Sequence, residues 1–204
     1  MKTLFSLLLG LSVLQAQVKE VKIGTQVWMT KNLNVSTFKN GDPITEAKTA
    51  EEWIMAGENK QPAWCYFDND PTNGTKYGKF YNWYAVIDAR GLAPNGYHIP
   101  TDTEWTKLID YLGGKEVAGT KMKSSSGWYQ NGNGTNESGF NGLPSGGRSP
   151  DGPFAPIGSY GSWWSSSEEN ASFAWYRGLK YRDGVIVGNS YFKENGLSVR
   201  CLRD

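Results

Sequence analysis

Residues 174–187 read Ala-Trp-Tyr-Arg-Gly-Leu-Lys-Tyr-Arg-Asp-Gly-Val-Ile-Val, and this stretch decides the fold. Two runs of strand-forming residues, 174–179 and 185–187, flank Asp183-Gly184, a dipeptide that favours a tight turn between antiparallel strands. A similar run, 197–200, follows a second such dipeptide, Asn195-Gly196, and Trp163-Trp164 begins another run earlier in the chain. The sequence therefore predicts a group of short antiparallel strands after Gly158.

A further hairpin is predicted near the N-terminal end of the chain. Residues 21–29 alternate apolar and polar side chains around Gly24-Thr25, which is the pattern of two half-buried strands joined by a tight turn. We expect this hairpin and the C-terminal strands to share one sheet.

Two helices are predicted, each by a capping box in which a Thr is followed three residues later by a Glu. The first box, 49–52, precedes Trp53, and Gly57 is expected to end that helix. The second box, 101–104, follows Pro100, and Gly113-Gly114 is expected to end that helix. No other segment sustains helical periodicity. The second helix carries an apolar stripe along one face, formed by Trp105, Leu108, Ile109 and Leu112.

The stretch 114–156 is rich in Gly, Ser, Asn and Pro, with isolated aromatic residues among them. Because such rings anchor a segment on a core, we expect long ordered loops there rather than disorder. The whole chain of 204 residues has 9 Trp, 11 Tyr, 8 Phe and 25 Gly but only 38% hydrophobic residues, so its core relies on rings. The predicted fold class is α+β, with two short helices, small antiparallel sheets and long ordered loops. The tryptophans expected in the core are Trp28, Trp53, Trp105 and Trp163.

The charge is balanced, because 21 Lys and Arg oppose 20 Asp and Glu and leave a formal net charge of +1. This balance argues against nucleic acid as a partner. Lys2 precedes an apolar run that ends at Ala16-Gln17, which is typical of a secretory signal peptide and too short to span a membrane. We expect residues 1–17 to be a signal peptide, with a buried N-terminal helix as the alternative. Residues 18–204 are then a single domain, secreted or held at the cell surface.

Five phrases together resemble a known family. They are Gly-Thr-Gln-Val-Trp-Met-Thr-Lys-Asn-Leu (24–33), Tyr-Gly-Lys-Phe-Tyr-Asn-Trp-Tyr-Ala-Val (77–86), Gly-Tyr-His-Ile-Pro-Thr-Asp-Thr-Glu-Trp (96–105), Trp-Trp-Ser-Ser-Ser-Glu (163–168) and Gly-Leu-Ser-Val-Arg-Cys-Leu-Arg-Asp (196–204). The set is similar to the Fibrobacter succinogenes major paralogous domain, a family of exported bacterial proteins, over residues 20–204. The resemblance implies a C-type-lectin-like fold, distantly similar to formylglycine-generating enzymes and to the variable ligand-binding proteins of diversity-generating retroelements. It implies no particular biochemical activity.

Cys65 and Cys201 are the only cysteines. In an exported chain an even number favours a disulfide, which here would close a loop of about 137 residues and stabilise the fold by roughly 4–5 kcal/mol. The resemblance also places a cysteine beside the C-terminal end, where a disulfide ties the last strand to the body. Two buried free thiols are the alternative. A catalytic pair is the third reading, but the close-spaced cysteines of formylglycine-generating enzymes are missing here.

No catalytic residue, metal site or cofactor is expected. His98, the only histidine, lies between apolar neighbours just before the second helix, where a packed or hydrogen-bonded structural role is expected. Residues 68–74 carry several oxygen ligands but lack the spacing of a calcium loop, so a polar turn is predicted. The serines of 124–126 and 165–167 have no accompanying base or nucleophile elbow, and their hydroxyls are expected to satisfy backbone groups around a turn at Trp163-Trp164.

The stretch 169–195 is expected to carry a ligand-binding surface. Rigid rings together with Arg make effective contacts with sugars and with proteins, and the resemblance to the retroelement-diversified proteins places a ligand on the same stretch. The alternative is that these rings only fill the core. Strand alternation predicts that Trp175 is buried and that Tyr176 and Lys180 point outward. The expected ligand-binding residues are Phe173, Tyr176, Arg177, Lys180, Tyr181, Arg182 and Tyr191.

The expected function is that of an exported, non-catalytic binding module for a glycan or a protein ligand. The alternative is a structural or adhesive surface component, which predicts a flat polar surface without an aromatic cleft. A third possibility, a cysteine-oxidase-like enzyme, requires Cys65 and Cys201 to be reduced, exposed and on the wall of a pocket.

Overall fold

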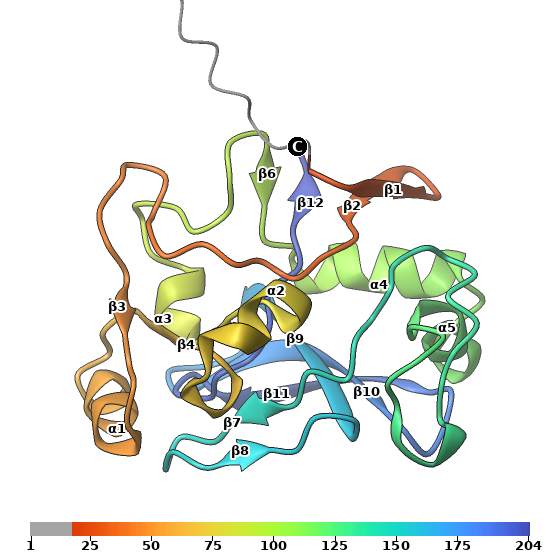
Figure 1. The fold of residues 1–204 in the computed structure, drawn as a ribbon. Coiled ribbons are helices and arrows are strands. Elements are labelled where there is room, and N and C mark those ends of the chain that lie inside the picture. Colours follow the sequence, from red (N-terminus) through yellow and green to blue (C-terminus); the bar gives the residue numbers. More distant parts are fainter. Residues whose placement is uncertain (1–17) are drawn as a thin grey trace, which may run out of the picture.

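The computed structural model describes residues 18–204, which form an α+β fold (Figure 1). The predicted signal peptide, 1–17, lies outside the described residues. Within 18–204 no helix has the length and the apolar character that crossing a membrane requires. The strands are β1 (Glu20–Ile23), β2 (Gln26–Met29), β3 (Thr45–Glu46), β4 (Ala63–Cys65), β5 (Phe80–Tyr81), β6 (Tyr97–His98), β7 (Gly147–Arg148), β8 (Phe154–Ala155), β9 (Tyr160–Glu168), β10 (Phe173–Lys180), β11 (Ile186–Phe192) and β12 (Leu202–Arg203). The helices are α1 (Ala50–Glu58), α2 (Gly74–Tyr77), α3 (Trp83–Val86), α4 (Asp102–Tyr111) and α5 (Lys115–Met122), with short 3-10 turns η1 (Phe67–Asn69), η2 (Pro71–Asn73) and η3 (Tyr129–Asn131).

The long C-terminal strands form an antiparallel sheet of their own, in the order β11-β10-β9. β10 pairs with β11 from Phe173 opposite Phe192 to Leu179 opposite Ile186, which confirms the strands predicted on either side of Asp183-Gly184. β9 pairs with the other edge of β10, so β10 is the central strand. The sheet lies across the lower half of the molecule in Figure 1.

The predicted N-terminal hairpin is confirmed as β1 and β2, joined at Gly24-Thr25. The expectation that it shares a sheet with the C-terminal strands is wrong for β9, β10 and β11. The hairpin belongs to a second sheet, in the order β1-β2-β12-β6. Only the last strand, β12, links the C-terminal region to it. The expected strand at 197–200 is also absent: Tyr81 bridges Leu197, and Trp163 bridges Ser198. Because isolated bridges join 196–198 to different segments, no continuous ladder forms there.

Both predicted capping boxes are confirmed. Thr49 and Thr101 each accept a hydrogen bond from the backbone N–H three residues on, and the side chains of Glu52 and Glu104 accept from the N–H of each cap. The expected end of the first helix is wrong by two residues, because Gly57 lies inside α1 and Asn59 caps it.

One full helix was not predicted: α5 occupies the start of the stretch expected to be loops. Its buried residues are the small Ala118 and Gly119 together with Met122, so it has no broad apolar stripe that a sequence pattern could reveal. A Cβ added at Gly119 would lie 2.9 Å from the carbonyl carbon of Gly184, in the turn between β10 and β11. Close backbone contact with that turn therefore positions the helix. Apart from η3 and the short β7–β8 hairpin, the rest of the stretch is irregular and ordered, as expected.

Tryptophan rings form the centre of the core. Trp28, Trp53, Trp105 and Trp163 are each almost completely buried, as predicted. The ring centroids of Trp28 and Trp105 lie 4.7 Å apart, and Phe140 packs edge-on against both and against Trp163. Since Phe140 belongs to the irregular stretch, its ring anchors that stretch on the core.

Buried cations order the irregular segments by donating to their carbonyl oxygens. Three of them, Lys123, Arg148 and Arg200, are almost fully buried, and in residues 18–204 none of the three forms an ion pair with a carboxylate. Carbonyl groups that have no sheet partner are satisfied in this way. Arg200 donates to the carbonyls of Met29 and Phe140, Arg148 to those of Ala47, Thr49 and Gly152, and Lys123 to those of Gly132, Lys180 and Asp183.

The predicted disulfide between Cys65 and Cys201 is wrong. Both are free thiols buried in different core clusters, Cys65 on β4 opposite Phe80 and Cys201 in the segment that leads to β12. Burial raises the pKa of Cys65 to about 11 and that of Cys201 to about 12. Such thiols are neutral and poorly nucleophilic at physiological pH, so the two side chains serve as small apolar core residues.

Candidate functional site

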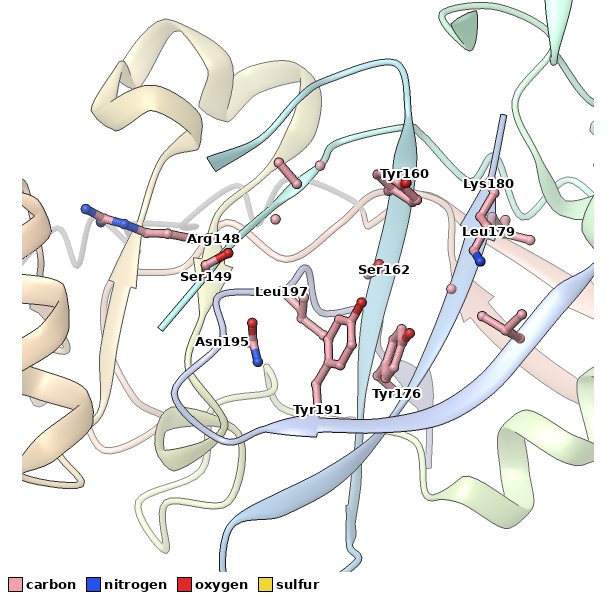
Figure 2. A pocket seen from close by; sticks show the side chains of 15 residues that line it. Arg148, Ser149, Tyr160, Ser162, Tyr176, Leu179, Lys180, Tyr191, Asn195 and Leu197 are labelled. Carbon is pink, nitrogen blue, oxygen red and sulfur yellow. The ribbon is translucent and has the colours of Figure 1, made fainter. Parts of the chain in front are cut away.

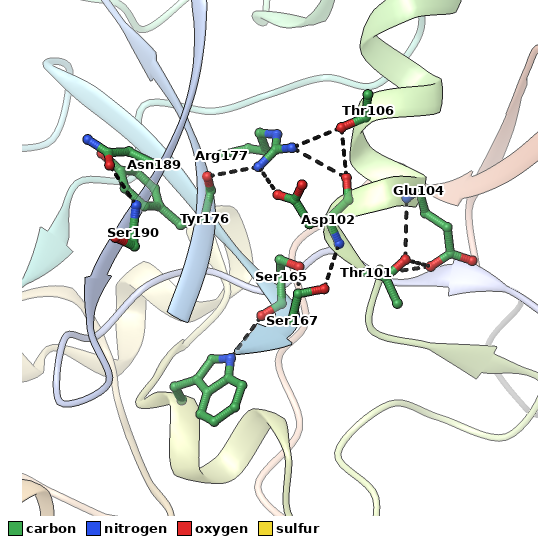
Figure 3. Close-up of polar contacts among 11 residues, drawn as sticks. Thr101, Asp102, Glu104, Thr106, Ser165, Ser167, Tyr176, Arg177, Asn189 and Ser190 are labelled. Atoms are coloured by element: carbon green, nitrogen blue, oxygen red, sulfur yellow. Dashed lines mark hydrogen bonds and ion pairs between the residues drawn. The ribbon is translucent and has the colours of Figure 1, made fainter. Parts of the chain in front are cut away.

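Helix α4 covers one face of the C-terminal sheet, and Arg177 on β10 binds the helix to the sheet (Figure 3). Its guanidinium lies 2.5 Å from Oδ1 of Asp102, at the start of α4, and also donates to the hydroxyl of Thr106. The hydroxyl of Ser167 on β9 accepts from the backbone N–H of Asp102 at 2.9 Å. Arg177 is only 4% exposed, so this predicted ligand-binding residue joins sheet to helix and is not available on the surface.

The opposite face of the sheet carries a pocket of about 290 Å³ (Figure 2). The start of β9, the second half of β10 and Val187 and Tyr191 of β11 form its floor, and the β7–β8 hairpin forms one wall. This volume is close to the lower end of the range of ligand pockets, about 300–1,000 Å³. Its labelled lining residues in Figure 2 are Arg148, Ser149, Tyr160, Ser162, Tyr176, Leu179, Lys180, Tyr191, Asn195 and Leu197.

Two stacked tyrosines are the main feature of the pocket. The rings of Tyr176 on β10 and Tyr191 on β11 lie 4.1 Å apart and are nearly parallel, at 17°. Tyr176 is 6% exposed and Tyr191 is 41% exposed, so the inner ring supports the outer one. Burial, followed by the neighbouring Tyr191 hydroxyl, raises the pKa of Tyr176 well above its usual value. The Tyr176 hydroxyl therefore stays protonated at physiological pH and can donate a hydrogen bond.

Glycine makes room for the inner ring. A Cβ added at Gly178 would lie 3.0 Å from the ring of Tyr176 and 3.1 Å from the side chain of Val187. Because position 178 has no side chain, the ring of Tyr176 lies along its own strand and still leaves an opening in front of it.

Positive charge is present at one end of the pocket. Lys180, the last residue of β10, is exposed and forms no ion pair with any residue of the described chain. The guanidinium of Arg148 turns away from the pocket toward the carbonyls that it binds (Figure 2). No Asp or Glu is among the described residues that line the pocket. Within residues 18–204, Lys180 is thus the one lining residue whose charge has no partner.

The structure brings three of the seven predicted ligand-binding residues together: Tyr176, Lys180 and Tyr191 all line the pocket. Phe173 instead packs on Phe192 at the far end of the sheet, with ring centroids 4.4 Å apart. Tyr181 and Arg182 follow the end of β10; the guanidinium of Arg182 donates to the Tyr181 hydroxyl, and Tyr181 packs on Tyr129.

The predicted orientation of β10 is partly wrong. Lys180 is exposed, as expected, but Tyr176 is buried and Trp175 is half-buried. The register with β9 shifts between Ala174 and Tyr176, which is an irregularity that alternation cannot anticipate. In addition, α4 covers one face while Tyr191 and the β7–β8 hairpin cover the other, so neither face is simply the solvent side.

Sequence reasoning missed the other half of the pocket. Tyr160 and Ser162 lie two residues apart on β9, so they share a face, and that spacing was the available signal. The Asn195 side chain and the β7–β8 hairpin are brought to the pocket by the fold alone, since nothing in their local sequence marks them.

The other polar candidates have structural roles. Asp70 accepts from the backbone N–H of Thr72 in the turn at 68–74, which is the polar turn predicted there. The hydroxyls of Ser166 and Ser167 bond to backbone groups, as predicted, but those groups belong to Ile99 and Asp102. The turn expected at Trp163-Trp164 is absent, because both residues lie inside β9. Among residues 18–204 no group of three His, Cys, Asp or Glu side chains is arranged to hold a metal ion.

His98 is held between two carboxylates, which confirms the hydrogen-bonded role predicted for it. Its Nδ1 lies 2.8 Å from Oδ1 of Asp204, and its Nε2 lies 3.0 Å from Oε1 of Glu104. Burial lowers the pKa of His98, but the hydrogen bonds to Asp204 and Glu104 outweigh burial, so the net shift is upward.

This geometry predicts a pH-dependent contribution to stability. Because the folded-state pKa of His98 is raised, the contribution is fully present below the unfolded value, about 6.5, and is lost as pH rises through the folded-state value. We expect His98→Gln to destabilise the protein by up to about 1 kcal/mol at pH 5.5 and by less at pH 9, since the site is partly exposed. Urea unfolding of both proteins at the two pH values measures this, and an equal difference at both would contradict it.

The molecule is therefore an α+β domain with a tyrosine-lined pocket on the face of its C-terminal sheet that lies opposite α4. Residues 21–203 match the family model described as Fibrobacter succinogenes major domain, and the chain belongs to this family. The match confirms the resemblance seen in the five sequence phrases. No curated protein matches the chain, and no solved structure does.

Proposed function

We propose that this protein is a non-catalytic binding module that holds a sugar unit of a glycan in the tyrosine-lined pocket. The stack of Tyr176 and Tyr191 is the observation that carries the proposal. An outer ring that is supported from behind offers a rigid apolar face, and sugar rings pack their C–H faces on such surfaces. The hydroxyls of both tyrosines and of Ser162, together with the Asn195 amide, supply the few polar groups that orient a ligand.

A binding role accounts for the pocket better than a structural or adhesive role does. A spacer or assembly unit predicts a flat polar surface, whereas this face is concave and aromatic. A small concave pocket also suits a sugar unit better than a folded protein partner, whose contact area is about 800 Å². The proposal includes export to the cell exterior. It also includes a C-type-lectin-like arrangement of the chain, which the small antiparallel sheets and the long ordered loops support.

Removing the outer ring tests the proposal. We expect Tyr191→Ala to weaken binding to an immobilised polysaccharide panel about tenfold, because the sugar loses its stacking surface. Tyr111→Ala is the matched control, since Tyr111 is an exposed tyrosine at the end of α4, outside the pocket. Pull-down and glycan-array titration measure the effect. Equal binding by wild type and Tyr191→Ala contradicts the proposed site, and capture of a protein with no glycan bound would favour a protein ligand.

A further inference from the structure

The charged side chains that line the pocket in the described chain are both positive. The Arg148 guanidinium turns away from the pocket and donates to three carbonyls, so the Lys180 ammonium is the charge that faces a ligand. Arg182, two residues further on, is also exposed and donates to the Tyr181 hydroxyl. The side chain of the nearby Asp183 accepts from the backbone N–H of Val185 and lies close to buried Lys123.

The free ammonium lies beside an aromatic ring. Lys180 on β10 is the direct partner of Tyr160 on β9, and Tyr176, Gly178 and Lys180 share one face of the strand. Side chains of directly opposed residues have Cβ atoms about 4.5–5.5 Å apart. Tyr160 is 41% exposed, so its ring and the ammonium are both available to one ligand.

We propose that the pocket selects an acidic glycan, with a hexuronic acid ring packed among Tyr160, Tyr176 and Tyr191 and its carboxylate on the Lys180 ammonium. This inference rests on the proposed function and specifies its ligand. A carboxylate at the ring carbon C5 lies at the rim of a pyranose whose face is stacked, so one sugar unit reaches both the rings and the charge. Among the described residues, the lining has no acidic side chain that would repel it.

The test compares sugars that differ only in charge. Oligosaccharides of galacturonate, glucuronate and mannuronate, and the methyl ester of each, are titrated calorimetrically into wild type, Lys180→Gln, Lys180→Arg and Lys107→Gln. Lys107 is an exposed lysine on α4, which covers the other face of the sheet, and it serves as the matched control. We expect at least one acid to bind wild type about tenfold more tightly than its ester, because an ammonium–carboxylate contact is charge-assisted.

Each outcome of this titration either supports or overturns the inference. Loss of the acid preference in Lys180→Gln, its retention in Lys180→Arg and Lys107→Gln, and its weakening by salt support the inference. Equal affinity for acid and ester, or an acid preference that survives in Lys180→Gln, overturns it and leaves glycan binding standing. If none of these sugars binds, the inference is overturned. The polysaccharide panel with Tyr191→Ala then decides the proposed function separately.

Discussion

Replacing Arg200 by Met is expected to destabilise the folded state by about 3–5 kcal/mol, a large part of the stability of a domain of this size. Arg200 is completely buried in the segment between Ser198 and β12. Its guanidinium lies 3.2 Å (Nε) and 2.8 Å (Nη2) from Oδ1 of Asn32 and 3.1 Å (Nη1) from the carbonyl of Met29, and it also donates to the carbonyl of Phe140. Met fills similar space but leaves these acceptors buried without a donor.

The size of the effect follows from what Arg200 joins. Met29 ends the N-terminal hairpin and Phe140 belongs to the irregular stretch, so one side chain links the two ends of the described chain to the loop layer. The guanidinium also lies over the Phe140 ring, 4.4 Å from its centroid. Burial lowers the pKa of Arg200 to about 9, which leaves it charged at physiological pH and dependent on these acceptors.

Guanidinium chloride unfolding measures the loss, and two variants calibrate it. Arg203→Met removes an arginine whose side chain is 52% exposed and paired with Glu20, and should cost at most about 1 kcal/mol. Arg200→Lys keeps the charge but loses the planar donor fork, so an intermediate loss is expected. If Arg200→Met and Arg203→Met destabilise the protein equally, the linking role of Arg200 is wrong.

Local structure could be predicted from the sequence wherever its cause is local. The hairpin around Gly24-Thr25 and the two capping boxes each depend on residues within a few positions of one another, and all three are present. Sheet membership was not predictable, because it depends on contacts between distant segments, such as the pairing of Leu202 with Trp28. Helix α5 was missed for a related reason: contact with the distant Gly184 holds it in place.

The candidate site was half predictable. Alternation on β10 and the aromatic residues of β11 point to Tyr176, Lys180 and Tyr191, which do line one pocket. Arg177 and Tyr176 are equally suggestive in sequence, yet they lie on opposite faces, and only the position of α4 assigns Arg177 to the interior. The buried cations were invisible for a further reason: their partners are backbone carbonyls, which every residue carries.

The disulfide prediction failed because an even number of cysteines in an exported chain indicates an oxidising compartment. It says nothing about the distance between the two cysteines in the fold. A disulfide requires Cα atoms about 4.4–6.8 Å apart. Here the two cysteines belong to separate clusters of the core, so no long loop is closed between them and each side chain contributes by packing.

Gly132→Ala is expected to destabilise the protein by about 2–3 kcal/mol, although the backbone of Gly132 suits any residue. Its φ is −71°, so alanine introduces no backbone strain there. The added Cβ, however, would overlap the carbonyl oxygen of Tyr181 and lie 2.7 Å from its carbonyl carbon. The segment after η3 must then move away from the end of β10.

That displacement disrupts a second contact. The ammonium of Lys123 lies 2.5 Å from the carbonyl of Gly132 and 2.8 Å from that of Asp183, and so ties this segment to the turn after β10. When the segment moves, a buried cation loses an acceptor, which costs more than the steric overlap alone. Faster amide hydrogen exchange at 181–184 is expected in the variant, because this turn loses its fixed neighbour.

Gly96→Ala separates the two ways in which a glycine can be required. Gly96 has a φ of +80° and no atom within 4 Å of an added Cβ, so its substitution costs only backbone strain, about 1 kcal/mol. Urea unfolding of both variants should therefore rank Gly132→Ala as the more destabilising, although Gly96 has the more unusual backbone. The reverse ranking would mean that the 129–134 segment is not packed tightly on the end of β10. In that case Lys123 could not fix the strand end that carries Lys180 to the pocket.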